Sequence, residues 1–232
     1  MRQARLKIDD QATWYHCYNR ISGTSGDLPF GAVEKEQFVR ILKRVSQLYT
    51  VEVAGYQVMS NHYHLILYAP VEQPSESEVC RRYKRYYHGR RRLKPGSEKC
   101  AQWQARCRDI SWFMRHVQQL FTVWYNGSRP VQRRGSLWGS RFKHTLLEGG
   151  EALWKCLAYV ENNGVRAGLA SSAGAYRFGS YGVWRQTGQH PFSKTLKKRV
   201  LPMMQDRYGV KNLSELCQML GETLQDNTTR NR

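Results

Sequence analysis

The alternation and spacing of apolar residues predict seven main elements within the first 163 residues. Alternation of apolar and polar side chains indicates a strand, whereas apolar residues that recur every three to four positions indicate a helix. The elements are, in chain order, a strand over 13–21, a helix over 34–49, a strand over 51–59, a strand within 59–68, a helix over 110–125, a strand over 135–148 and a helix from 151 to about 163. Shorter helices are expected over 195–204 and 213–224.

The two helices that precede residue 130 have wide apolar faces. Residues 34–49 place six apolar side chains at helical spacing, and residues 110–125 form the clearest amphipathic segment of the chain. Asp109 is the expected N-cap of the second helix and Gly127 its expected stop. The first six elements follow the order strand, helix, strand, strand, helix, strand of a ferredoxin-like (RRM-like) fold. We therefore predict an α+β protein whose antiparallel sheet carries helices on one face, with a C-terminal helical extension.

The charge of the chain narrows the choice of partners. The 232 residues include 37 Lys and Arg against 18 Asp and Glu, which gives a formal net charge of +19. This excess favours a polyanion, most simply nucleic acid, over an anionic membrane surface. No apolar run reaches the ~18–20 residues of a membrane-spanning helix. Residues 1–10 lack the apolar centre of a signal peptide, and six scattered cysteines contain no Cys-x-x-Cys pair, so we expect a cytoplasmic protein with free thiols.

The stretch 71–109 interrupts the ferredoxin-like order of elements. Between residues 79 and 94 it holds eight Lys or Arg and three Tyr, with no acidic residue. Cations neutralise phosphates, and aromatic rings stack on unpaired bases. A solvated basic loop is the alternative interpretation, but the mixture of tyrosines and cations favours contact with nucleic acid.

Two histidines stand two positions apart in the strand within 59–68. Side chains at positions i and i+2 point to the same face of a strand, so His62 and His64 share one face while Tyr63, Leu65 and Leu67 share the other. Two imidazoles on one face are able to bind one metal ion. The alternative is a buried histidine that only hydrogen-bonds a neighbour.

A tyrosine and an asparagine share one flank of the helix that starts at residue 151. Tyr159 and Asn163 are four positions apart, so they lie one turn from each other, beside the face formed by Leu153, Leu157 and Val160. This flank is able to face the sheet. By itself, however, Tyr159 also suits a boundary packing role, and Asn163 suits the end of a helix.

Together these motifs resemble the HUH single-tyrosine transposases, and most closely the REP-associated tyrosine transposases. Residues 60–65 (Ser-Asn-His-Tyr-His-Leu) correspond to the family's His-hydrophobe-His strand. Residues 159–169 (Tyr-Val-Glu-Asn-Asn-Gly-Val-Arg-Ala-Gly-Leu) are similar to its Tyr-Ile-His-Leu-Asn-Pro-Val-Arg-Ala-Gly-Leu segment, with Gly164 in place of the proline. Residues 138–143 (Trp-Gly-Ser-Arg-Phe-Lys) are similar to its Gly-Arg-Phe-Lys strand. The resemblance extends over roughly residues 13–184.

The resemblance implies a DNA transposition enzyme that nicks and rejoins single-stranded DNA near hairpin-forming REP elements. It implies a covalent 5′-phosphotyrosine intermediate, a divalent metal (Mg²⁺ or Mn²⁺), a monomer or homodimer, and a place in the bacterial cytosol or nucleoid. The implied roles are Tyr159 as the nucleophile, His62, His64 and Asn163 as metal ligands, and Arg141, Lys143 and Arg166 as DNA contacts.

Two other functions remain open. One is a non-catalytic nucleic-acid-binding module, such as an RRM-like binder or a transposase that has become a repressor. The other is a metal-dependent hydrolase that uses water and leaves no covalent adduct. We divide the chain into a transposase-like domain over 1–185, with a basic insertion at about 71–109, and a helical tail over 186–232.

Overall fold

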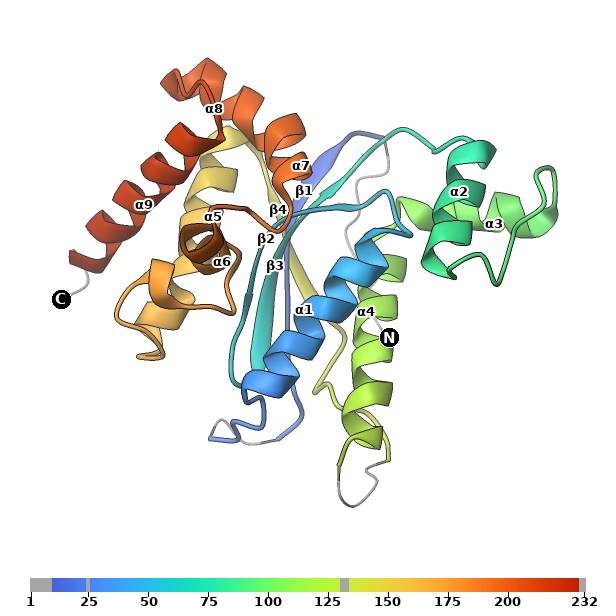
Figure 1. Cartoon of the computed structure of the whole chain (residues 1–232), viewed down its shortest axis with the longest axis horizontal. Coiled ribbons are helices and arrows are strands. Elements are labelled where there is room, and N and C mark those ends of the chain that lie inside the picture. Colours follow the sequence, from blue (N-terminus) through green and yellow to red (C-terminus); the bar gives the residue numbers. More distant parts are fainter. Residues whose placement is uncertain (1–9, 24–25, 130–133, 230–232) are drawn as a thin grey trace.

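The computed structural model describes residues 10–23, 26–129 and 134–229, and it contains the four expected strands (Figure 1). The strands are β1 (Thr13–Arg20), β2 (Glu52–Val58), β3 (His62–Ala69) and β4 (Lys143–Leu147). They form one sheet in the order β2-β3-β1-β4, and every neighbouring pair is antiparallel. The predicted α+β, ferredoxin-like class is therefore confirmed. The expectation that the chain has no signal peptide concerns residues 1–10, and residues 1–9 lie outside the described residues.

Two helices cover the first face of the sheet, as expected. These are α1 (Ala32–Ser46) and α4 (Ile110–Gly127), which pack against each other and against the apolar side of the central strands. The Asp109 carboxylate caps α4 by accepting hydrogen bonds from the amides of Ser111 and Trp112, at 2.6 and 3.2 Å. The strand residues beneath them are Tyr15, Cys17, Tyr63, Leu65 and Leu67.

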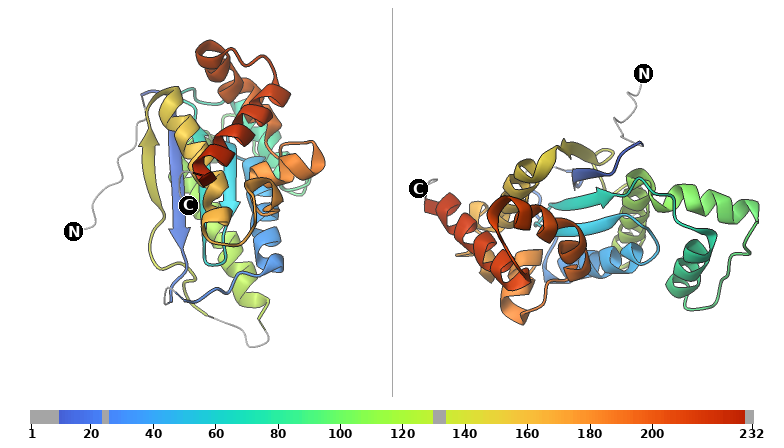
Figure 2. Two further views of the ribbon diagram at one scale, coloured as in Figure 1. Left: turned by 90° about the vertical axis from the view of Figure 1, so that its left-hand side faces the viewer. Right: turned by 90° about the horizontal axis from the view of Figure 1, so that it is seen from above.

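The second face of the sheet is covered too, which differs from the prediction of helices on one face. Helix α5 (Gly149–Arg166) lies across that face, so the sheet is sandwiched between helices (Figure 2). The physical reason is that the second face is also partly apolar: Trp14, Ile66 and Tyr68 join α5 in a separate buried cluster. The two histidines of β3 lie on this second face, next to that cluster.

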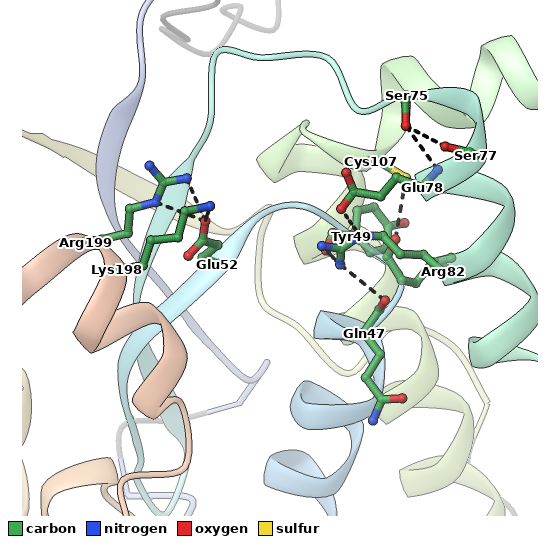
Figure 3. Close-up of polar contacts among 11 residues, drawn as sticks. Gln47, Tyr49, Glu52, Ser75, Ser77, Glu78, Arg82, Cys107, Lys198 and Arg199 are labelled. Carbon is green, nitrogen blue, oxygen red and sulfur yellow. Dashed lines mark hydrogen bonds and ion pairs between the residues drawn. The ribbon is translucent and has the colours of Figure 1, made fainter.

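The basic insertion folds into two helices, α2 (Glu76–Tyr86) and α3 (Glu98–Cys107), at the side of the domain away from α5 (Figure 1). Its inner side joins the first core through Val79, Tyr83 and Cys100. Arg82 fastens α2 to the segment that follows α1, because its guanidinium donates to the Tyr49 carbonyl at 2.7 Å; Glu78, one turn earlier on α2, pairs with the same guanidinium (Figure 3). The insertion is thus a structured appendage with fixed orientation.

The chain after α5 is helical and packs back onto that helix. It contains η1 (Ala173–Ala175), α6 (Ser180–Thr187), α7 (Ser193–Thr195), η2 (Leu196–Val200), α8 (Leu201–Tyr208) and α9 (Leu213–Thr229). The predicted helix over 195–204 therefore spans three short pieces. Arg199 pairs with Glu52 of β2 at 2.9 Å, which ties η2 to the sheet (Figure 3). Within the described ranges, no helix combines the length and hydropathy needed to cross a bilayer.

Candidate active site

A pocket of about 430 Å³ opens where β3 begins, on the sheet face that α5 covers. It gathers side chains from β1, β3, β4 and α5, which are far apart in the sequence. Its lining includes five of the residues singled out from the sequence, namely His62, His64, Lys143, Tyr159 and Asn163. We call it the His pocket.

The imidazole of His62 is held by a side chain that precedes it. Its Nδ1 lies 2.7 Å from Asn61 Oδ1, and Asn61 Nδ2 donates to the Asp27 carbonyl at 2.9 Å. Because the amide nitrogen of Asn61 is the donor there, its oxygen must accept from His62 Nδ1. This pattern leaves Nε2 as the nitrogen of His62 that is available to a ligand.

A third histidine, His16 of β1, lies under His64 and was not identified from the sequence. His16 Nε2 and His64 Nδ1 are 2.9 Å apart, and their rings stack with centroids 5.1 Å apart. The His64 ring is also 5.2 Å from that of His62. Both histidines of β3 therefore have their Nδ1 atoms engaged, in the way that metal-binding imidazoles are usually oriented by a second hydrogen bond.

Burial keeps these three imidazoles neutral at pH 7. It lowers the pKa of His16 to about 4 and, together with the charge of Arg20, lowers the pKa of His62 to about 4. The pKa of His64 falls to about 3 through burial first and the neighbouring His16 and His62 second. Neutral imidazole is the form that binds a metal ion.

Helix α5 brings Tyr159 to the mouth of the His pocket. The Tyr159 ring is 5.8 Å from the ring of His64 and 5.9 Å from that of His16, centroid to centroid. The residue is 41% exposed, so the phenol stands between the buried imidazoles and solvent. Arg166, one turn beyond Asn163, places its guanidinium carbon 5.4 Å from the centre of the Tyr159 ring.

Asn163 presents its amide oxygen as the candidate ligand atom. Its Nδ2 donates to the carbonyls of Tyr159 and Val160, at 2.9 and 3.3 Å, which leaves Oδ1 without a role in the helix. The described residues contain no group of three His, Cys, Asp or Glu side chains spaced for a metal ion. The donor set here is instead two imidazoles and one amide, which suits a divalent cation that keeps open positions for water and phosphate.

A buried glutamine fixes α5 over the sheet. Gln57 of β2 donates to the Glu161 carbonyl and accepts from the Gly164 amide, both at 3.0 Å. Gly164 also lies against the ring of Tyr176, where a Cβ would come within 2.8 Å of a ring carbon. The departure from the proline of the resembling family therefore has a local reason, since proline would lack the N–H that Gln57 accepts.

The three predicted DNA contacts lie in different places. Lys143 lines the His pocket next to Tyr18, its register partner on β1, and Arg166 stacks on Tyr159. Arg141 does not line the His pocket; it lines a separate groove beside α4. The structure thus brings Lys143 and Arg166 to the candidate site and leaves Arg141 apart from it.

The basic insertion presents cations far from the His pocket, beyond the opposite end of β3. From Arg81 to Lys94, Arg82 is the one Lys or Arg with a carboxylate partner in the described part of the chain. Arg91 stacks on Tyr87, with its guanidinium carbon 4.9 Å from the ring centre. This surface therefore carries uncompensated positive charge, although Tyr83 and Tyr86 are buried and not open to stacking.

Comparisons with known proteins identify a similar fold. No protein-family model matches the chain, and no curated protein matches it in sequence. Among solved structures, a REP-associated tyrosine transposase bound to a REP hairpin is similar, with a TM-score of 0.52 and 14% sequence identity. The similarity covers 83% of this chain and 89% of that chain. At this level of identity, the finding shows that the two proteins share a fold.

Proposed function

We propose that this protein is a metal-dependent enzyme that cuts and rejoins single-stranded DNA through a phosphotyrosine intermediate. The observation that carries the proposal is the position of Tyr159, whose ring lies 5.8 Å from that of His64 at the mouth of the His pocket. The phenol of Tyr159, two neutral imidazoles and the amide of Asn163 therefore line the same pocket. The similarity in fold to a tyrosine transposase, and the net charge of +19, support a DNA substrate.

The proposed metal ligands are Nε2 of His62, Nε2 of His64 and Oδ1 of Asn163. A bound Mg²⁺ or Mn²⁺ would polarise a phosphate oxygen and offset the charge that develops on it. The chain's own contribution is to hold these donors in place, through Asn61 for His62 and through His16 for His64.

In the proposed reaction, Tyr159 Oη attacks the phosphorus of a phosphodiester. The Oη–P bond forms while the bond from phosphorus to the 3′ oxygen breaks. The phosphate therefore joins the tyrosine to the 5′ oxygen of the downstream strand. The proton that leaves the phenol is balanced by the one that the departing 3′ oxygen takes up. Lys143 and Arg166 are the proposed contacts of the phosphate, and rejoining is the same reaction in reverse. A site near a hairpin-forming repeat is the proposed substrate.

The test is whether a covalent adduct forms through Tyr159. We expect the full chain, with labelled single-stranded DNA containing hairpin repeats and Mn²⁺, to form an adduct that survives denaturing electrophoresis. Tyr159→Phe should abolish the adduct, since the nucleophilic oxygen is removed, and His62→Ala or EDTA should reduce it by at least ~100-fold. Tyr208→Phe is the matched control, because Tyr208 is a similarly exposed tyrosine on α8.

Persistence of the adduct in Tyr159→Phe would contradict the proposal. Cleavage without any adduct would indicate a hydrolase that uses water. DNA binding in EDTA without cleavage under any condition would favour the second candidate, a non-catalytic binding module. The specific observation in favour of that candidate is the uncompensated positive charge between Arg81 and Lys94, on α2 and the segment that follows it. Binding through this charge requires neither a metal ion nor a tyrosine nucleophile.

A further inference from the structure

A second groove lies on the opposite side of the sheet from the His pocket. It has a volume of about 520 Å³ and runs between the outward face of α4 and the segment 138–142. The lining residues that matter here are Trp112, Arg115, Gln119, Trp138, Arg141 and Phe142. We call it the α4 groove.

Two arginines, Arg115 and Arg141, line the α4 groove, together with one carboxylate, Asp109, which caps α4. A third arginine, Arg106, stacks on the lining residue Trp112. The guanidinium carbons of Arg106 and Arg115 lie 4.4 and 5.2 Å from the ring centre of Trp112, and both Arg115 and Arg141 are exposed. None of these three arginines pairs with a carboxylate within the described part of the chain. A guanidinium that is stacked on an indole keeps its in-plane N–H donors for a phosphate.

The floor of the α4 groove is aromatic. Trp112 is half-buried and offers the ring surface of the groove, with the exposed amide of Gln119 beside it. Trp138 and Phe142 are buried and close the bottom of the groove with apolar surface. Cations with aromatic faces are the features that bind unpaired nucleotides, whereas a double helix keeps its base faces stacked inside. The volume lies in the ~300–1,000 Å³ range of small-molecule pockets, which suits about one or two nucleotides.

One short segment forms the wall between the two pockets. Gly139, Ser140 and Lys143 line the His pocket, while Trp138, Arg141 and Phe142 line the α4 groove. The segment is fixed to β1, because Asn19 Nδ2 donates to the Ser140 carbonyl at 2.9 Å and the Gly139 amide donates to the Arg20 carbonyl at 3.0 Å. A strand of DNA that leaves the His pocket at Lys143 therefore needs to cross only this segment to reach Arg141.

We propose that the α4 groove binds unpaired nucleotides of the DNA strand whose phosphate is held at the His pocket. The inference rests on the proposed function for the identity of that strand. It gives Arg141 a role that its position outside the His pocket otherwise leaves unexplained. Acidic peptides and anionic lipids fit less well, because neither carries a flat ring beside every charge, as a nucleotide does.

The test uses the full chain in EDTA, so that binding is measured without cleavage. Arg115→Glu and Trp112→Leu should each weaken binding of single-stranded DNA by about tenfold. Arg40→Glu is the matched control, since Arg40 is an exposed arginine on α1 with 74% of its side chain accessible. Strands that carry 5-iodouracil should cross-link, on irradiation, to a peptide within residues 111–123. Circular dichroism confirms that each variant is folded.

Equal weakening by Arg115→Glu and Arg40→Glu would overturn the proposal, since it would show only general electrostatic attraction. Duplex DNA or anionic vesicles that compete as well as a single strand would also overturn it. The adduct assay is independent of both readouts. An adduct without cross-links at 111–123 would contradict nucleotide binding in the α4 groove and support the proposed enzyme activity. Cross-links without an adduct would support nucleotide binding in the groove and contradict the enzyme activity.

Discussion

Single residues decide whether the His pocket is able to hold a cation. His64 Nδ1 faces His16 Nε2, so if His64 Nε2 binds a metal, its Nδ1 carries the proton and donates to His16. His16 would then be a positioning residue: it touches neither DNA nor metal, but it sets the tautomer and orientation of His64.

We expect His16→Leu to weaken Mn²⁺ binding by ~10–100-fold, the usual effect of losing the hydrogen-bond partner of a ligand. His16→Gln should retain part of the affinity, because its amide oxygen is able to accept the same hydrogen bond. The measurement is Mn²⁺ titration of the full chain followed by electron paramagnetic resonance. An unchanged dissociation constant in the leucine variant would show that His16 only fills space.

Sequence reasoning found His62 and His64 because the two-residue period of a strand puts them on one face. It could not find His16, because the register of β1 against β3 sets that contact and no local pattern encodes register. The same limit applies to Gln57, which reads as an ordinary strand residue until α5 is placed above it.

At the scale of elements, the position of α5 is the central feature. The helix was predicted from its apolar spacing, but its place on the second face of the sheet was not. The ferredoxin-like order of elements places helices only on the first face. The signal that was available is the apolar character of Trp14, Ile66 and Tyr68, which share the face of His62 and His64. The insertion 71–109 was recognised from its charge, whereas its two helices were not predicted.

The end of α5 offers a direct test of what fixes that helix. Gly164→Pro should lower the free energy of unfolding by ~3 kcal/mol, because it removes the N–H bonded to Gln57 and forces atoms into the Tyr176 ring. Gly164→Ala keeps the N–H and tests the steric part alone, with ~1–3 kcal/mol expected.

Urea denaturation measures the effect of both substitutions. Gly150→Ala is the control at the other end of α5, where a Cβ would make ordinary contacts at 3.6 Å with Met203. A fully stable Gly164→Pro variant would mean that the contacts of Gln57 and Tyr176 do not hold the helix.

At the scale of the whole molecule, burial of histidines couples stability to pH. Besides His16, His62 and His64, burial lowers the pKa of His116 to about 4 and that of His190 to about 3. An unfolded histidine titrates near 6.5, so the unfolded chain binds more protons than the folded chain below that pH. Buried Glu161 acts in the opposite direction, since burial raises its pKa to about 7.

We therefore expect the free energy of unfolding to fall as pH drops from about 6.5 to about 4. Each histidine contributes up to ~1.4 kcal/mol per pH unit, and five histidines outweigh the single glutamate. Chemical denaturation at a series of pH values measures the slope. His116→Gln should lower this slope by up to ~1.4 kcal/mol per pH unit, the contribution of one proton. The substitution leaves the His pocket unchanged, because His116 lies away from it, between Tyr49 and Tyr86. Stability that is constant over this range would contradict the prediction.

The packing of the last helices onto α5 has a consequence for the proposed boundary at residue 185. One side of α5 faces the sheet, and its back contacts α8 and α9 through a cluster that includes Val200, Met204 and Leu220. Truncation at that boundary would expose the apolar side of α5 to solvent and remove the contacts that hold the helix against the sheet. The phenol of Tyr159 and the amide of Asn163 would then move relative to the imidazoles. The C-terminal helices therefore determine how accurately Tyr159 is positioned, although none of their described residues lines the His pocket.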